Sequence, residues 1–404
     1  MKKILWLLLP LLLLTACGKE PVPETAPPTV EVEIPYVEQT QPPLPYEGVE
    51  LYFRSIWQKT DPLAQVTVQA AQQFERTTGA VVKILWPGEE AKRVDIFQIS
   101  AADFEALGEG TTLDLTEMAE KSGYTEKSHE ALRTEIKGRC GYLGAVAQVP
   151  YLGGIYYNAD VFTTCGITKM PATWEEFVET SRILREKGWV PLTLDKEDAV
   201  AAMELHLRRT LGIEEMNRLM GKKAQWHFEQ PVTNAMELVM LYVQGGNMAF
   251  GTPADYPGGQ NKMGISNSAM MVGTNADCAD VEAATLTTLR WGVFPYPGEK
   301  ESGTWLTADM VAISPDCKDA QAAFDFVMLL TTGEFDQLRV DIGRGIPADP
   351  ANVSAIEGAL EAIAAAPPQA LGIFGEKQTD VATKLWSAWY DKPNRYAIAL
   401  ERSK

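Results

Sequence analysis

Residues 148–162 form the run that most restricts what this chain can fold into. The β-forming residues 155–157 (Ile-Tyr-Tyr) stand directly after the pair Gly153 and Gly154. Glycine lets the backbone change direction at little steric cost, and β-branched and aromatic residues favour strands. We therefore predict a strand, a crossover at the glycines and a second strand, in that order.

A loop and a helix are expected next. Thr173 and Glu176 have the three-residue spacing of a capping box, in which each residue satisfies a backbone N–H at the start of the helix. Apolar side chains then recur at helical spacing. Gly188 is placed to end this helix, because glycine readily takes the left-handed conformation of a C-terminal cap.

The size and charge of the chain exclude several classes of protein. With 404 residues it can bury the cores of two or more domains, and 46% hydrophobic and 22% charged residues are typical of a soluble globular protein. The net charge of −18 argues against nucleic acid as a partner, because phosphates require a basic face. It also argues against attraction to anionic lipid through a polybasic patch.

The N-terminus is predicted to be a targeting segment and a tether. Residues 1–17 carry two lysines directly after Met1 and continue in an apolar run that is shorter than the roughly 20 residues of a membrane-spanning helix. Residues 14–18 resemble a bacterial lipobox, which implies that Cys17 is diacylated and anchors the chain to a membrane from outside the cytoplasm. Residues 18–47 are rich in proline and glutamate and should form an extended tether between lipid and folded body.

The run 148–177 resembles the extracellular solute-binding proteins of ABC transporters, in particular the carbohydrate-binding group that includes maltose-binding protein. The shared order is a proline-containing strand, a crossover, Tyr-Asn-x-Asp-x-Phe at 157–162, a loop, and Pro-x-Thr-Trp-Glu-Glu at 171–176. Further segments resemble the family in the same order, at 94–98, 268–275, 291–295 and 343–348. The resemblance covers roughly residues 48–350.

This resemblance implies an α/β chain with a two-lobed, type II periplasmic-binding-protein-like fold, whose lobes are joined by crossover strands. Lobe 1 would contain residues 48–150 and 301–332. Lobe 2 would contain residues 151–300 and 333–404. The sequence departs from the family at 86–93, where only eight residues separate two predicted strands. A crossover between parallel strands normally takes a dozen residues or more, so either the second helix is lost or the strands pair differently.

No catalytic motif is present. The sequence lacks a Walker loop, a His-Glu-x-x-His pair and a Gly-x-Ser-x-Gly elbow, and its three histidines are scattered. We therefore predict a protein that is not an enzyme and needs no cofactor or metal. Cys140 and Cys165 flank the central strand pair, where they either form a disulfide or remain two separate buried thiols.

A binding protein of this type needs a cleft between its lobes, lined by residues at strand ends. A sugar would be held there by aromatic faces and by hydrogen bonds from carboxylates, amides and arginine. Carrying the resemblance over position by position gives these candidate ligand-binding residues: Trp57, Gln58, Gln98, Asp103, Tyr151, Thr274, Asn275, Trp305, Asp309 and Arg344.

The function implied is that of a lipid-anchored, monomeric binding protein. It would capture a solute, most simply a mono- or oligosaccharide, by hinge closure, and would deliver it to an ABC permease whose ATPase resides in other chains. Three alternatives remain open. The same fold could bind a peptide, a polyamine or another small solute. The chain could be a glycan-processing enzyme of the cell envelope, which needs two carboxylates roughly 5–10 Å apart. It could also be a structural surface lipoprotein without a ligand.

Overall fold

The computed structural model describes residues 43–101, 103, 110–194, 268–285, 288–300, 303–343 and 345–364, with the strand at 248–250 and scattered positions between 202 and 218. The folded body begins at Leu44. The targeting segment, Cys17 and most of the predicted tether lie outside the described residues. Within the described part of the chain, no helix combines the length and the apolar character needed to span a membrane.

The first part of the body is a parallel β-α-β unit. Its elements are β1 (Glu50–Arg54), α1 (Pro62–Thr78) and β2 (Val81–Leu85). Asp61 caps α1 by accepting a hydrogen bond from the backbone N–H of Leu63, and the helix ends at Gly79, whose φ of 81° is left-handed. An N-terminal cap, a proline at the first helical position and a terminal glycine thus set both ends of α1.

The short connection at 86–93 has a structural explanation. β3 (Ile96–Ile99) does not pair with β2, because both strands lie parallel to β1 on its two sides. The chain passes from one side of β1 to the other without a helix between β2 and β3. The sequence left two alternatives, a lost helix or a different strand pairing. The structure shows the first, because no helix lies between β2 and β3.

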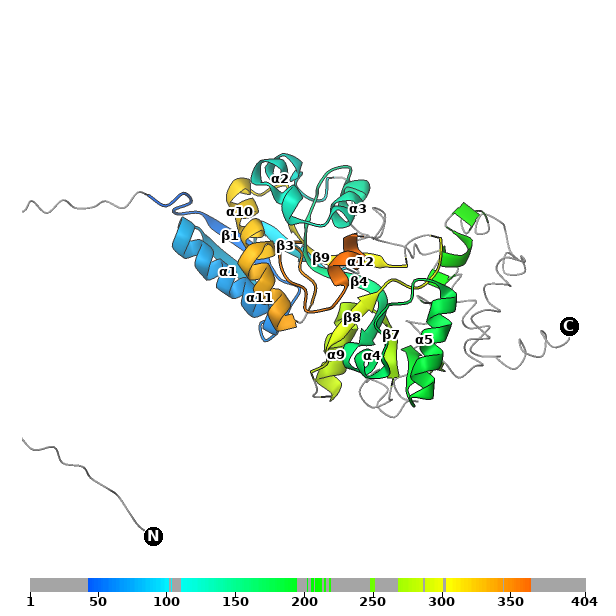
Figure 1. The fold of residues 1–404 in the computed structure, drawn as a ribbon. Helices are drawn as coiled ribbons and strands as arrows, with labels where there is room; N and C mark the ends of the chain where they lie inside the picture. The colour runs from blue at the N-terminus through cyan, green and yellow to red at the C-terminus, as the bar shows by residue number, and fades with distance from the viewer. Residues whose placement is uncertain are drawn as a thin grey trace, which may run out of the picture. The chain divides into compact units, whose positions relative to one another are not determined.

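The longest strand joins two parts of the sheet. After α2 (Thr116–Ser122), a short 3-10 helix and α3 (Glu130–Cys140), the chain enters β4 (Val146–Asn158). The first part of β4 pairs antiparallel with β9 (Trp305–Ile313), and residues 154–158 pair with β7 (Ser268–Gly273) and β8 (Trp291–Phe294) (Figure 1). The partner strands change between Gly153 and Gly154, where the sequence predicts the crossover.

The region after β4 follows the predicted loop and helix. Thr173 and Glu176 form the capping box at the start of α5, which confirms that prediction. A parallel group β6-β5-β7 then extends the sheet beyond β4. The elements of this region are α4 (Ala159–Cys165), α5 (Trp174–Glu186), β5 (Val190–Leu194), β6 (Met248–Phe250), β7, α9 (Asn275–Thr285) and β8.

The last described elements return to both parts of the sheet. α10 (Ala320–Thr331) and α11 (Gly333–Gly343) pack with α1, whereas α12 (Ala359–Ala364) packs on β8 (Figure 1). The sequence assigns α11 to lobe 2, yet its helical neighbours α1 and α10 belong to the segments assigned to lobe 1. The exact lobe boundaries remain a prediction. Residues 365–404, which the sequence also assigns to lobe 2, lie outside the described residues.

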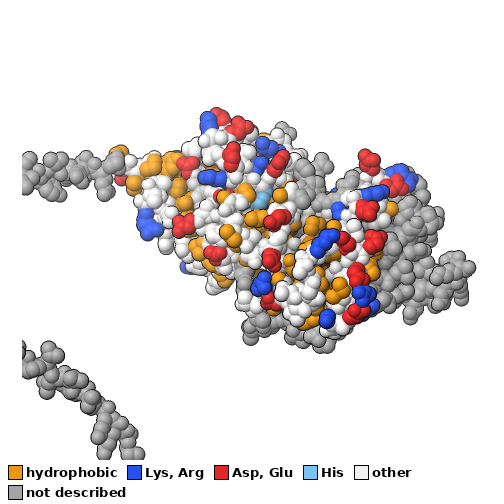
Figure 2. Space-filling model, viewed as in Figure 1, with side chains coloured by type: hydrophobic (Ala, Val, Ile, Leu, Met, Phe, Trp, Pro, Cys, Tyr) orange, Lys and Arg blue, Asp and Glu red, His pale blue; other side chains and the backbone are white. Residues whose placement is uncertain are grey.

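Two hydrophobic clusters cover the sheet. The larger one surrounds β1, β3, β9 and the helices α1 and α10, and the smaller one surrounds β5, β7 and the helices α4 and α5. Cys140 is buried and Cys165 half-buried, and both are free thiols, so the separate-thiol alternative holds. On the face shown in Figure 2, acidic and basic side chains are interspersed.

At the crossover, the backbone of β4 lies unusually close to an aromatic ring from β9. Gly153 pairs with Trp305, and the indole of Trp305 lies directly over the glycine. A Cβ added at Gly153 would stand 1.8 Å from a carbon of that indole. The absence of a side chain at Gly153 is therefore required for Trp305 to occupy its place.

We predict that Gly153→Ala lowers the free energy of unfolding by about 1–3 kcal/mol, because the new methyl group forces the indole out of position. Urea unfolding followed by circular dichroism measures this loss. Gly138→Ala in α3 is the matched control, since a Cβ there meets nothing within 4 Å. Replacing a glycine inside a helix by alanine should raise the free energy of unfolding by about 0.5–1 kcal/mol. Equal effects of the two substitutions would contradict this account of the crossover.

Candidate functional site

Tyr151 is fixed at the crossover by a carboxylate from the neighbouring strand. Its hydroxyl donates a hydrogen bond of 2.8 Å to Oδ2 of Asp309. Oδ1 of Asp309 accepts a second bond, 2.9 Å long, from the backbone N–H of Ala101, which follows β3. In the β4–β9 register Asp309 stands opposite Val149, so it is the diagonal neighbour of Tyr151. The Asp309 carboxylate thus links β9 to Tyr151 on β4 and to the residue after β3.

Burial changes the ionisation of both partners. It raises the pKa of the Asp309 carboxyl, and the hydrogen bonds from Ala101 and Tyr151 and the charge of Arg339 offset only part of that rise. The pKa of the Tyr151 hydroxyl is raised well above its usual range by burial and by the adjacent carboxylate. Tyr151 therefore keeps its proton at any physiological pH and can act as a neutral donor.

Asn275 holds the backbone on both sides of Tyr151. Its Oδ1 accepts a hydrogen bond of 2.9 Å from the N–H of Leu152, and its Nδ2 donates one of 3.1 Å to the carbonyl of Pro150. The side chain is 4% exposed, so both bonds are buried. Asn275 begins α9 and links that helix to β4. Its neighbour Thr274 donates from its backbone N–H and its hydroxyl to Asp277.

Gln98 organises the loop that carries Trp57. Its Oε1 accepts from the hydroxyl of Ser55 at 2.8 Å and from the N–H of Ile56 at 3.0 Å. Its Nε2 donates to Oε1 of Gln148 at 2.6 Å. Gln148 is the extra residue of a bulge in β4, which turns its side chain toward Gln98. These bonds leave Trp57 half-buried at the end of the loop.

The remaining candidates are placed less centrally. Trp305 is half-buried, with its indole on Gly153 and against the smaller hydrophobic cluster. Gln58 and Asp103 are exposed, and Asp103 accepts a hydrogen bond of 2.6 Å from Ser100. Arg344 lies outside the described residues. Among the described contacts, none joins Gln58 or Asp103 to Tyr151.

The sequence prediction missed Arg339, which lies near the crossover. Its charge lowers the pKa of both Tyr151 and Asp309, and a nitrogen of its guanidinium would stand 3.6 Å from a Cβ placed on Gly345. It forms a buried ion pair of 2.6 Å with Asp336 and donates to the carbonyl of Ile346. The Asp-x-x-Arg spacing on one helix was the only signal for this pair, and such spacings are common on helices.

Asp336 fixes the segment that leaves α11. Besides Arg339, its carboxylate accepts hydrogen bonds from the N–H groups of Ala348 and Asp349 and from the side chain of Asn352. The carbonyl of Pro347 also contacts Nε2 of His129 at 2.9 Å. The segment at 347–352, which follows α11, is therefore held against α11 and against the start of α3.

The predicted residues thus separate into two kinds. Gln98, Asn275 and Asp309 are buried and already use their polar atoms within the chain, so they position neighbouring groups. Tyr151, Trp57 and Trp305 are half-buried and keep part of their ring surface accessible. Aromatic faces and a neutral phenol oxygen that can still accept a hydrogen bond suit an uncharged ligand with both apolar and hydroxyl surfaces.

A family model described as bacterial extracellular solute-binding protein matches residues 57–334. A sequence search of curated proteins finds no match. Several solved structures share the fold. One is apo RafE from Streptococcus pneumoniae, with 18% identity, a TM-score of 0.64, and coverage of 88% of this chain and 96% of that one.

Two other structures are similarly related. AcbH, a bacterial solute receptor described as having an exclusive substrate preference for β-D-galactopyranose, has 18% identity and a TM-score of 0.63. The match covers 87% of this chain and 94% of that one. The maltose-maltodextrin binding protein of Alicyclobacillus acidocaldarius has 17% identity, a TM-score of 0.57, and coverage of 84% and 95%. At these identities the likeness establishes the fold, that of type II periplasmic binding proteins, as predicted.

We predict that Asn275→Ala destabilises the chain by about 1–3 kcal/mol for each buried backbone group that it leaves without a partner, Leu152 N–H and Pro150 C=O. Urea unfolding measures the change. Gln58→Ala, at an exposed side chain, is the control and should shift stability by less than about 0.5 kcal/mol. A loss as small as that of the control would show that Asn275 does not hold the crossover.

Asp309 should make stability depend on pH. Because its pKa is raised in the folded chain, ionisation is easier in the unfolded chain. The parent protein should therefore lose stability relative to Asp309→Asn as the pH rises from the ordinary value of 3.8 through the raised pKa. Unfolding free energies across this range test the prediction. Asp316→Asn, at an exposed carboxylate, is the control. If the unfolding free energies of the parent protein and of Asp309→Asn change with pH in the same way, the prediction is wrong.

Proposed function

Because this chain belongs to the bacterial extracellular solute-binding proteins, we propose that it captures a mono- or oligosaccharide outside the cytoplasm and supplies it to an ABC importer. The observation that carries the choice of ligand is that three predicted aromatic residues stay half-buried: Tyr151 and Trp305 on the crossover strands, and Trp57 on the loop after β1 that Gln98 holds. The family consists of binding proteins. We therefore propose that the chain serves transport and catalyses no reaction.

Sugar recognition would divide between rings and hydroxyls. The indoles of Trp57 and Trp305 offer flat faces to the C–H surfaces of a pyranose. Tyr151 donates a hydrogen bond to Asp309, and its phenol oxygen keeps a lone pair that can accept a hydrogen bond from a sugar hydroxyl. Since the pKa of Tyr151 is raised, this geometry does not change over the physiological pH range.

Capture would proceed by closure about the crossover. β4 continues from its pairing with β9 into its pairing with β7 and β8, so a small backbone rotation at Gly153 and Gly154 would move one part of the sheet relative to the other. A ligand that touches both parts only in the closed form stabilises that form selectively. The closed form would then be recognised by a permease whose ATPase resides in other chains.

Attachment to the membrane belongs to the same proposal. Lipid on Cys17, followed by the proline- and glutamate-rich tether, would keep the binding body close to the importer. Tyr46 shows where the tether would join the body. Its hydroxyl donates a hydrogen bond of 2.5 Å to Asp325 on α10, its N–H donates to the carbonyl of Thr78, and its ring stacks on Phe74.

Solved relatives suggest which sugars to test. One structure of RafE is described as a complex with raffinose, and AcbH is described as preferring galactopyranose. A panel of raffinose, galactose and maltotriose, with spermidine and a tripeptide as other solute classes, therefore covers the alternatives. A solute that binds only the folded chain raises the melting temperature by mass action.

We expect one saccharide of this panel to raise the melting temperature of the intact chain, with no turnover of that sugar. Tyr151→Ala should weaken its binding about tenfold to a hundredfold, as for a central aromatic contact. Tyr142→Ala is the matched control, because that tyrosine is also half-buried and its hydroxyl donates to a carbonyl, that of Thr112. A shift with spermidine or the peptide alone would overturn the sugar assignment, and product formation would favour the envelope enzyme.

A further inference from the structure

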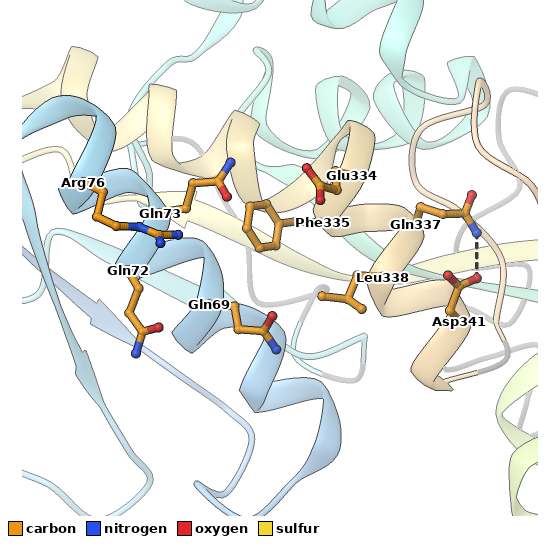
Figure 3. Close-up of a pocket in the computed structure, with 9 residues that line it drawn as sticks. All are labelled: Gln69, Gln72, Gln73, Arg76, Glu334, Phe335, Gln337, Leu338 and Asp341. Carbon is orange, nitrogen blue, oxygen red and sulfur yellow. Dashed lines mark hydrogen bonds between the residues drawn. The ribbon is translucent and has the colours of Figure 1, made fainter. Parts of the chain in front are cut away.

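A polar groove lies between α1 and α11. Figure 3 shows side chains from both helices facing each other across it. Its volume is about 490 Å³, within the range of roughly 300–1,000 Å³ that is typical of small-molecule sites. None of its lining residues belongs to the crossover site described above.

Each helix contributes one continuous stripe to this groove. From α1 come Gln69, Gln72, Gln73 and Arg76, which are spaced i, i+3, i+4 and i+7. Residues with this spacing share one face of a helix. On α11, Glu334, Gln337, Leu338 and Asp341 have the same spacing, and Phe335 borders the groove beside them. The stripes are therefore aligned along about two turns of each helix.

The amides of α1 are available for a ligand. Within the described residues, the side chains of Gln69, Gln72 and Gln73 make no hydrogen bond. Gln337 across the groove differs, because it donates to Asp341 at 2.9 Å and exchanges hydrogen bonds with the backbone of Val353. Each uncommitted amide can donate two hydrogen bonds and accept two.

Apolar side chains complete the groove. Phe335 is buried and Leu338 half-buried, and Figure 3 shows both between the two polar stripes. The lining carries the guanidinium of Arg76 and the carboxylates of Glu334 and Asp341, a net charge of −1. The groove therefore disfavours anions, and its single net negative charge, open to solvent, attracts cations only weakly.

We propose that this groove is a second binding site, for a neutral saccharide. Uncommitted amides that both donate and accept suit sugar hydroxyls, and the apolar side chains between the stripes suit a C–H face. Because Gln69, Gln72 and Arg76 are exposed to solvent, binding here is weaker than in an enclosed cleft. The inference does not rest on the crossover site, since no residue is shared.

Saturation-transfer NMR on the intact chain tests the proposal, because it detects weak and rapidly exchanging ligands. The probes are raffinose and maltotriose, with a tripeptide and spermidine as competitors. In the Tyr151→Ala chain, whose crossover site is weakened, we expect saccharide signals that fall about tenfold when Gln72→Ala/Gln73→Ala is added, as for the loss of two hydrogen-bonding amides. Gln65→Ala is the matched control. It removes an amide of the same helix outside the groove, one that donates to the carbonyl of Lys59.

The variant Tyr151→Ala separates the two sites. Saccharide signals that persist in Tyr151→Ala and disappear when Gln72→Ala/Gln73→Ala is added to it support the second site, even if the crossover proves to bind no sugar. Signals that disappear with Tyr151→Ala and survive the double variant overturn it. The absence of any saccharide signal, or displacement by the tripeptide at lower concentration than either sugar, also overturns it. Circular dichroism checks that each variant is folded.

Discussion

The structure depends on the uninterrupted hydrogen bonding of β4. This strand pairs with β9 over its first part and with β7 and β8 over its last five residues, so its backbone belongs to both parts of the sheet. A backbone that changes partners must keep its buried N–H and C=O groups satisfied. Asn275 does this at Leu152 and Pro150, where side-chain atoms supply the missing partners. Gly153 allows the indole of Trp305 to lie against the strand.

The polar groups around this strand explain how a binding site is organised without a catalytic motif. Asp309, Asn275 and Gln98 use their polar atoms on neighbouring backbone and side chains, which makes the site rigid around Tyr151 and Trp57. Several positions that were predicted to touch a ligand are thus buried and hydrogen-bonded within the chain, next to Tyr151 or the loop of Trp57. Buried polar groups with all partners in place tend to specify one arrangement, and partly paired ones are expensive to bury.

Many elements were predictable from local signals. Asp61 before Pro62, the pair Thr173 and Glu176, and Gly79 mark helix ends by chemistry that acts within four residues. The site was only partly predictable. Tyr151 follows from the crossover run, but Arg339 does not, because its approach to Tyr151 and Asp309 depends on how α11 packs. The roles of Asn275 and Asp309 likewise depend on strands that are far apart in sequence.

The sequence by itself determined the kind of chain: alternating strands and helices, a crossover at the glycine pair, and a family of binding proteins. These features rest on short-range periodicity, capping and motif order. Tertiary structure alone decided that β1 separates β2 from β3, that α11 packs against α1 to form a groove, and that buried carboxamides and a carboxylate support Tyr151. Such relations depend on which surfaces meet between segments that are far apart in the sequence. Those contacts are decided by side-chain packing and by the pairing of buried polar groups, which exist only in the folded chain.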